Sequence, residues 1–255
     1  MSKSKAAAGE PVRLIFDTDM GNDIDDALAL GIIHALESRG ECKLLAVTLT
    51  KGDRYAAPYV DIVNVFYGRG SIPIGSVRGG PTPAEGKYTR TVATATTDGK
   101  PRYPRTVAKT ADVPEATEVL RRTLAAQPDG SVAIVQVGFS TNLARLLDSK
   151  ADEHSPLDGK TLAAKKVRLL SVMAGSPNFP EFNVAKDIPA AQKLVAEWPS
   201  PIVFSPFEVG KAIKFPASSI LSDFAYVPHH PLKEGYEAYM KMPYDRETWD
   251  LTSVL

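Results

Sequence analysis

The sequence lacks the features that mark several specialised classes of protein. Its 255 residues include one cysteine, Cys42, so no disulfide can form within the chain. No run is long and apolar enough for a transmembrane helix, and we expect no membrane contact. The 30 basic and 30 acidic residues leave a formal net charge of zero. Because nucleic-acid binders normally carry a basic face, this balance argues against a nucleic-acid partner.

The first eleven residues, MSKSKAAAGEP, lack the apolar core of a signal peptide. We interpret residues 1–11 as a disordered leader, either an added segment or the stub of a removed one. A cytoplasmic location is the default expectation, and a secreted or periplasmic location follows if a leader was removed. Residues 12–255 are expected to form one domain, because no repeat or linker divides them and the chain is 44% hydrophobic.

Short apolar runs alternate with helical patterns along most of the chain. We expect strands at 12–17, 42–50, 72–77, 131–138, 167–174 and 201–207, and helices at 25–38, 56–67, 113–126, 142–147 and 188–198. This alternation predicts an α/β fold, a mostly parallel open sheet with helices on both faces. Segment 78–112 lacks periodicity and predicts a functional or disordered loop. Segment 217–255 is expected to be helical in pieces separated by prolines.

Polar residues follow four of the expected strands. Because ligands bind outside the carboxyl ends of the strands in open parallel sheets, these residues are expected to converge on a ligand. The four groups are Asp17 and Asp19; Gly52 and Asp53; Ser140, Thr141 and Asn142; and Asn178, Glu181 and Asn183.

The stretch IFDTDMGNDIDDALAL, residues 15–30, holds five aspartates within ten residues. Helix capping accounts for one or two aspartates but not for a pair at a strand end as well. Clustered carboxylates instead indicate a hard cation, calcium or magnesium. An EF-hand is excluded, because the twelfth position counted from Asp17 is Leu28 rather than glutamate.

A haloacid-dehalogenase-like phosphatase is one alternative for this stretch. Its D-x-D pattern would make Asp17 the nucleophile and Asp19 the acid, with magnesium bound. That family has Thr or Val where this chain has Gly21. It also does not open the next helix with an Asp-Asp pair, so the alternative explains less of the sequence.

The segment DTDMGNDIDDALAL resembles the amino-terminal signature of nucleoside hydrolases, D-T-D-x-G-x-D-D-A-L-A-L. Four later segments are similar to that family's motifs in the same order, namely GFSTNLARLL (138–147), VMAG (172–175), PEFNVAKDIPAA (180–191) and WDLTSVL (249–255). The resemblance implies the Rossmann-like nucleoside hydrolase fold, hydrolysis of an N-glycosidic bond in a small nucleoside or riboside, and a homodimer or homotetramer.

The resemblance also implies a bound Ca²⁺. By the motif match, its ligands would be the carboxylates of Asp19, Asp26 and Asp250 and the carbonyl of Thr141. Asp19 would be the general base for the attacking water, and calcium would lower the pKa of that water.

The remaining matched positions would bind the substrate. Asp25 would hydrogen-bond the ribose or the water, and the other residues with implied substrate contacts are Glu181, Asn183, Met173 and Trp249. Asp53 stands where the family usually has a ribose-binding asparagine. The oxocarbenium-like transition state of such a cleavage is stabilised by nearby carboxylates.

This chain departs from the family pattern in three places. It has two extra residues before the Asp-Asp pair, which we interpret as an insertion of Asn22 and Asp23. It has Trp249 where purine-type members often place a histidine, and an indole can stack on a base but cannot protonate it. Segment 78–112 lacks a His-Gly loop, and its Tyr103 is either an acid or a structural tyrosine.

The main prediction is therefore a calcium-dependent N-ribosyl hydrolase. A calcium-stabilised ribose- or sugar-binding protein with weak catalysis is the second alternative, because the leaving-group histidine is missing. The four histidines are expected to be packing or surface residues. The family usually continues with further helices beyond the last motif, so the chain is either a short member or lacks a C-terminal tail.

Overall fold

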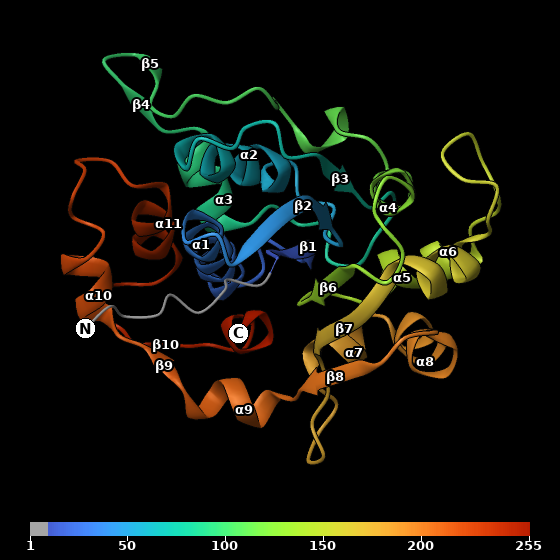
Figure 1. Ribbon diagram of the computed structural model, residues 1–255. Coiled ribbons are helices and arrows are strands. Elements are labelled where there is room, and N and C mark those ends of the chain that lie inside the picture. Colours follow the sequence, from blue (N-terminus) through green and yellow to red (C-terminus); the bar gives the residue numbers. More distant parts are fainter. Residues whose placement is uncertain (1–9) are drawn as a thin grey trace, which may run out of the picture.

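The computed structural model describes residues 10–255, so the predicted leader lies almost wholly outside the described residues. Six parallel strands form the central sheet, in the order β3-β2-β1-β6-β7-β8 (Figure 1). Their bounds are β1 Val12–Thr18, β2 Cys42–Leu49, β3 Ile74–Ser76, β6 Val132–Gln136, β7 Val167–Met173 and β8 Ile202–Ser205. The α/β fold predicted from the alternating pattern is confirmed.

Helices cover both faces of the sheet because successive strand residues point to opposite sides. In β1, Leu14 and Phe16 pack into a core with helices α1 (Asp25–Ser38) and α2 (Ala56–Phe66). Ile15 packs into a second core on the other face. The helices of that second core are α4 Ala116–Ala125, α5 Thr141–Asp148, α6 Gly159–Lys166 and α8 Ile188–Glu197. Burial on both faces explains why the strands read as continuous apolar runs.

Segment 78–112, expected to be a functional or disordered loop, contains short elements of secondary structure. It contains helix α3 (Lys87–Ala93), a two-stranded ribbon of β4 (Thr96–Thr97) and β5 (Lys100–Pro101), and a 3₁₀ turn η1 (Thr110–Asp112). Helix α3 is held by tertiary contacts, because the backbone N–H of Gly21 donates to the Tyr88 hydroxyl at 2.7 Å. A seven-residue helix is too short to show a clear apolar period.

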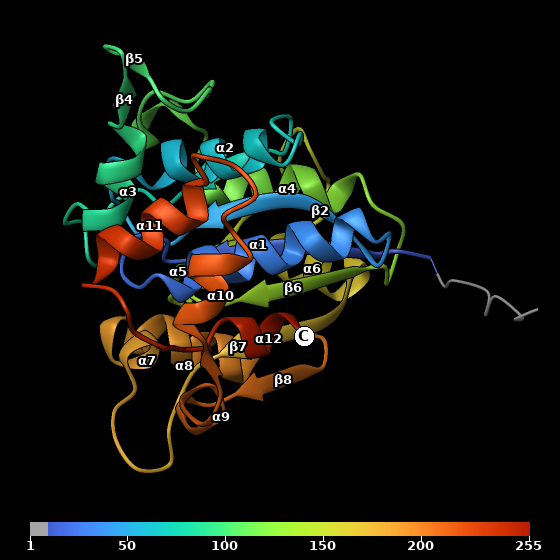
Figure 2. The same ribbon diagram turned by 90° about the vertical axis from the view of Figure 1, so that its left-hand side faces the viewer.

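The C-terminal part is helical in pieces, as expected. After α7 (Phe182–Lys186) and β8 come the short elements α9 Phe207–Ala212, β9 Lys214–Phe215, α10 Ala217–Ser222, α11 Pro231–Tyr239, β10 Arg246–Glu247 and α12 Leu251–Val254. Strands β9 and β10 pair antiparallel. Helix α12 lies beside α1 and β7 (Figure 2). Within residues 10–255, no helix is long and apolar enough to cross a membrane.

The order of the strands creates a switch point between β1 and β6. From β1 the chain builds β2 and β3 on one side, and it later returns to place β6 and β7 on the other. In open parallel sheets, the crevice at such a point is the usual ligand site. Asp19 follows β1 and Gly138 follows β6, so the aspartate-rich loop opens into this crevice.

Candidate functional site

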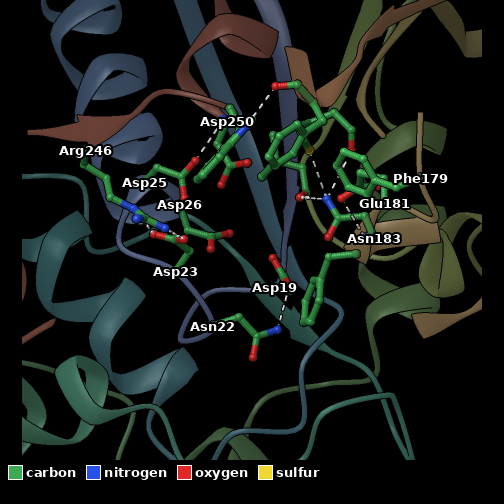
Figure 3. Close-up of a pocket in the computed structure, with 15 residues that line it drawn as sticks. Asp19, Asn22, Asp23, Asp25, Asp26, Phe179, Glu181, Asn183, Arg246 and Asp250 are labelled. Atoms are coloured by element: carbon green, nitrogen blue, oxygen red, sulfur yellow. Dashed lines mark hydrogen bonds and ion pairs between the residues drawn. The ribbon is translucent and has the colours of Figure 1, made fainter. Parts of the chain in front are cut away.

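A cavity of about 320 Å³ lies at this end of the sheet, within the usual size range of ligand pockets. Its walls come from the loop after β1, the segment after β7 and the C-terminal segment (Figure 3). Eight of the ten predicted site residues line it: Asp19, Asp25, Asp26, Met173, Glu181, Asn183, Trp249 and Asp250. The structure therefore brings together residues from the first and last parts of the chain.

Three carboxylates gather on one side of the cavity. One oxygen each of Asp25, Asp26 and Asp250 lies within 4.8 Å of the others, and none of these residues is more than 5% exposed. The backbone N–H of Asp250 donates to Asp25 Oδ2 at 3.2 Å, which joins the two ends of the chain. Burial, followed by repulsion from neighbouring aspartates of the loop, raises the pKa of all three carboxyl groups well above the ordinary value.

Asp19 is oriented by an amide that a buried lysine holds in place. Lys51 Nζ donates to Asn22 Oδ1 at 2.8 Å, and Asn22 Nδ2 donates to Asp19 Oδ2 at 2.6 Å. Because an ammonium group can only donate, it fixes which end of the amide faces the carboxylate. Burial raises the pKa of the Asp19 carboxyl to about 6, although Asn22 and Lys51 oppose this effect. The other carboxylate oxygen, Asp19 Oδ1, takes no part in the hydrogen bond with Asn22.

Asp23 turns to a different partner from the other aspartates of the loop. Arg246 donates from Nε to Asp23 Oδ1 at 2.9 Å and from Nη2 to Asp23 Oδ2. Both residues line the cavity, opposite Glu181 and Asn183 (Figure 3). Arg246 thus engages Asp23, whereas Asp25 and Asp26 are the loop carboxylates that gather with Asp250. Our placement of the insertion at Asn22 and Asp23 stays a prediction.

The opposite wall is pre-organised by hydrogen bonds. Glu181 caps helix α7, where Oε1 accepts from the Asn183 N–H at 2.9 Å and Oε2 accepts from the Gly175 N–H at 3.0 Å. The Asn183 amide donates from Nδ2 to the carbonyl oxygens of Val137 at 2.8 Å and Met173 at 3.1 Å. These bonds leave Asn183 Oδ1 as the amide's acceptor toward a ligand.

Two predicted site residues do not line the cavity. Asp53, for which a ribose contact was implied, instead accepts hydrogen bonds from Thr89 Oγ1 at 2.7 Å and the Gly86 N–H at 2.9 Å. This correction has a local reason, because the carboxylate is fully buried and its hydrogen bonds hold the start of α3. Thr141 begins α5 and donates from Oγ1 to Asp187, and its proposed role as a carbonyl ligand stays a prediction.

The aromatic part of the wall surrounds Trp249. The rings of Trp249 and Phe207 stack with centroids 5.2 Å apart, and the indole N–H donates to the Phe207 carbonyl at 2.9 Å. Phe179 meets Phe207 edge to face at 4.9 Å. The Arg246 guanidinium carbon lies 5.1 Å from the centre of the Trp249 ring. Trp249 is therefore already engaged by two neighbours.

Several lining residues were not identified from the sequence, namely Asn22, Val137, Phe179, Phe182, Phe207 and Arg246. A signal existed for Phe179 and Phe182, which flank the matched Glu181, and for Arg246, which precedes Trp249 by three residues. Phe207 and Val137 carried no signal beyond their positions at strand ends.

Other candidates for catalysis lie outside the cavity. None of the four histidines lines the cavity, and neither does Tyr103. Tyr103 is 5% exposed, as expected for a structural tyrosine rather than an acid. Asp17, the nucleophile of the phosphatase alternative, is fully buried below the cavity. Its Oδ1 accepts from Thr48 Oγ1 at 2.5 Å and from Asn142 Nδ2 at 2.8 Å. A buried, hydrogen-bonded carboxylate of this kind serves the fold rather than nucleophilic attack.

Comparisons with known structures show that the fold is shared. A plant nucleoside hydrolase shares 21% identity with a TM-score of 0.66, over 96% of this chain and 77% of that one. The inosine-uridine preferring nucleoside hydrolase from Bacillus anthracis shares 16% identity with a TM-score of 0.69, over 95% and 80%. The type III effector protein XopQ, solved with adenosine diphosphate ribose, shares 19% identity with a TM-score of 0.68, over 90% and 65%.

At these identities the similar structures establish the fold, and this chain spans less than two thirds of the effector's length. No curated protein matches the chain. The family assignment comes from the sequence pattern described as inosine-uridine preferring nucleoside hydrolase, which matches residues 14–250. The chain therefore belongs to the nucleoside hydrolase family, whose members are hydrolases acting on N-glycosyl bonds.

Proposed function

We propose that this protein hydrolyses the N-glycosidic bond of a ribonucleoside or a related riboside, with a calcium ion bound by its aspartates. One observation carries the proposal: a buried carboxylate trio lines the same cavity as the polar side chains of Glu181 and Asn183. The bond between the ribose C1′ and the base nitrogen breaks, and water supplies the new hydroxyl on C1′. The products are free ribose and free base.

The residues present fit a divalent cation. Three buried carboxylates have oxygens within 4.8 Å of one another, and burial followed by repulsion from neighbouring aspartates raises their pKa values, so a bound cation would stabilise their charged forms. Calcium prefers such oxygen donors and tolerates irregular loops. Asp26 and Asp250 would hold it together with Asp19 and the Thr141 carbonyl. When bound, it would neutralise the cluster and acidify a neighbouring water.

Asp19 is the proposed general base. Its Oδ2 is occupied by Asn22, so Oδ1 is the atom that would accept the proton of the attacking water. Burial raises the pKa of this carboxyl to about 6 in the metal-free site, and a bound cation would lower it, so the group is unprotonated at neutral pH and able to accept a proton. The Asn22–Lys51 contact would keep this carboxylate in one rotamer as substrate binds.

The two walls would hold the ribose between them. Glu181 and Asn183 Oδ1 are acceptors for sugar hydroxyls, and Asp25 is an acceptor on the opposite side. Positive charge that develops on the ribose ring would meet six lining carboxylates: Asp19, Asp23, Asp25, Asp26, Glu181 and Asp250. This field favours an oxocarbenium-like transition state over the neutral substrate.

The assay for this proposal uses protein stripped with EDTA and then supplied with CaCl₂. Inosine, uridine, p-nitrophenyl riboside and p-nitrophenyl phosphate are offered separately, and released ribose or nitrophenol is measured. We expect ribose release from at least one riboside, greater with calcium, and none of the phosphatase product. Absence of ribose from every riboside would refute the hydrolase, and ribose binding without release would support the sugar-binding alternative.

Substitutions in the site test whether the measured activity depends on its residues. Asp19→Ala and Asp26→Ala should each reduce turnover to background, because the first removes the base and the second a calcium ligand. Asp148→Ala is the matched control, since this aspartate is 67% exposed on its side chain and pairs with Lys193 outside the cavity. A normal rate in Asp26→Ala would contradict the proposed metal site.

A further inference from the structure

Arg246 is the basic residue among the fifteen residues that line the cavity, where six carboxylates surround it. It belongs to strand β10 and lies on the same side as Asp23, Asp25 and Asp26 (Figure 3). An unpaired arginine in such a field would move toward any carboxylate. Its orientation is instead defined by several specific contacts.

A bidentate ion pair with Asp23 sets the plane of the guanidinium, which is 16% exposed on its side chain. The planar group also lies against two rings, with its central carbon 5.1 Å from the Trp249 ring centre and 5.2 Å from that of Tyr239. Fork-like pairing and stacking of this kind pre-organise arginine, which a lysine could not reproduce.

The contacts leave donor capacity on Nη1. A guanidinium carries five N–H groups. Nε and Nη2 donate to Asp23, and Nη2 also lies 3.4 Å from the Tyr239 hydroxyl. Within residues 10–255, the hydrogen bond found for Nη1 is a long one of 3.4 Å to Glu247. One N–H of Nη1 therefore has no hydrogen-bond partner among the described residues, and Arg246 lines the cavity.

The position of Arg246 relative to Glu181 and Asn183 indicates which part of a bound riboside would reach the guanidinium. Glu181 and Asn183 lie across the cavity from Arg246 (Figure 3). Phe207 and Trp249 also line the cavity, and a ribose held by Glu181 and Asn183 would leave its base to the part that these rings and Arg246 line. Trp249 already contacts both Phe207 and the guanidinium. A base in this part of the cavity would therefore meet the guanidinium of Arg246. The Trp249 ring would not be free to stack on that base.

We propose that Arg246 contacts the leaving base and stabilises the negative charge that develops on it as the N-glycosidic bond breaks. This inference rests on the proposed function. When that bond breaks, its electron pair stays on the base nitrogen, and the proton that later neutralises it comes from water. Trp249 and Asp23 are positioning residues that hold the guanidinium, so the two extra residues of the aspartate loop acquire a function.

Arg246 would act by charge and hydrogen bonding rather than as an acid. Burial alone would lower the pKa of its guanidinium, but the hydrogen bonds and charge of Asp23 outweigh burial and raise it. The group therefore keeps its proton throughout. This differs from the histidine that purine-type members often place next to the last aspartate, and it explains how the site could function with Trp249 there.

The test compares Arg246→Gln with wild type on two substrates. Inosine has a leaving base that needs stabilisation, whereas the nitrophenolate of p-nitrophenyl riboside leaves readily. We expect kcat/KM to fall by about 10²–10³-fold on inosine, as for removal of one transition-state donor, and by less than about tenfold on the nitrophenyl compound. An equal loss on both substrates would overturn the proposal, because it would indicate general damage to the site.

Three further variants separate contact from positioning. Asp23→Asn/Arg246→Gln removes the unpaired charge that the single variant leaves, and it should stay as impaired on inosine as Arg246→Gln. Recovery in this double variant would show that the arginine merely neutralises Asp23. Arg246→Lys should recover only part of the rate. Arg102→Gln breaks a partly buried ion pair with Glu234 outside the cavity and should leave both substrates unaffected.

Binding of free hypoxanthine, followed by calorimetry, provides a readout that does not need turnover. Wild type should bind the base, and Arg246→Gln should bind it at least about tenfold more weakly. Equal affinity in the two proteins would overturn the base contact even if ribosides are hydrolysed. Arg246-dependent binding without hydrolysis of any riboside would retain the contact and refute the proposed function.

Discussion

Asn22 links the proposed base, Asp19, to the ammonium group of Lys51 through hydrogen bonds. Its amide accepts from Lys51 at 2.8 Å and donates to Asp19 at 2.6 Å, and Lys51 also donates to the Thr82 carbonyl at 2.8 Å. The lysine is 3% exposed, so its position is set by the fold rather than by solvent. This residue-scale arrangement orients a carboxylate through its hydrogen-bonding partner, as outer ligands do around metal sites.

We expect Asn22→Ala to lower kcat on a riboside by about 10–100-fold, the usual cost of losing such a supporting contact. KM should change less, because Asn22 orients the base rather than the sugar. Steady-state kinetics on p-nitrophenyl riboside measure both. Asn178→Ala is the control, since that amide donates to Glu208 and does not line the cavity. A kcat equal to wild type in Asn22→Ala would show that Asp19 needs no orienting partner.

At the scale of elements, the site depends on the close approach of the ends of β1 and β6. A Cβ atom at Gly138 would lie 2.5 Å from the Asp19 nitrogen and 2.4 Å from Thr50 Oγ1. The residue after β6 must therefore be glycine for the loop after β1 to reach its place. Close packing at this point therefore explains why the sequence motif has glycine at position 138.

Gly138→Ala should displace the Asp19 backbone. Overpacking of this kind costs about 1–3 kcal/mol of stability, and a shift of about 1 Å in a catalytic group can cost roughly 10²-fold in rate. Urea unfolding and kcat on p-nitrophenyl riboside test both effects. Gly52→Ala is the matched control, because its Cβ would have its nearest contact at 3.8 Å. Unchanged kcat in Gly138→Ala would contradict the steric argument.

At the scale of the whole molecule, the carboxylate trio joins the two ends of the chain. Asp250 lies 225 residues after Asp25 and donates its backbone N–H to it. A cation bound by Asp26 and Asp250 would stabilise only the folded state, where the carboxylates are together. Metal binding and global stability should therefore be linked.

Calcium at about 100 times its dissociation constant should add about 2.7 kcal/mol to the free energy of unfolding. For a chain of this length, that is roughly 5–10 °C in Tm. Thermal scans in CaCl₂ and in EDTA measure the difference. Asp26→Asn should show almost none, and in EDTA it should melt above wild type because one repelling charge is gone. The same Tm for wild type in both buffers would refute the metal site.

The stability of the whole molecule should also depend on pH. His34 is fully buried, with Nε2 2.9 Å from Asn64 Oδ1 and Nδ1 beside Arg69 and Glu37. Burial lowers its pKa from 6.5 to about 4. Between these values the unfolded chain binds a proton that the folded chain does not. The stability that the neutral imidazole contributes is therefore present above pH 6.5 and is lost as the pH falls toward 4.

His34→Gln should remove that part of the acid sensitivity, since glutamine keeps a donor for Asn64 but does not titrate. Between pH 7.5 and 5, wild type should lose about 2 kcal/mol more than the variant. Urea unfolding at the two pH values gives the difference. His154→Gln, a half-buried position outside the cores, should behave like wild type. An equal pH dependence in His34→Gln and wild type would contradict this account.

The sequence by itself determined the alternation of strands and helices, the aspartate-rich loop after the first strand and the order of the family motifs. These are local patterns, set by side-chain periodicity and by spacing along the chain, so they can be read without coordinates. They were sufficient for the α/β fold, the family and eight of the residues that line the cavity. Helix α3 was missed because seven residues leave too little period to detect.

Only the tertiary structure decided how distant segments meet. The pairing of Asp23 with Arg246 joins residues 223 positions apart, and it depends on how β10 packs against the aspartate loop. The same packing places the guanidinium over the Trp249 ring, whereas the sequence suggested an indole that can stack on a base. It also turned Asp53 away from the cavity to hold α3. Residue type and spacing do not specify such contacts, because each results from the combined packing of elements that lie far apart in the chain.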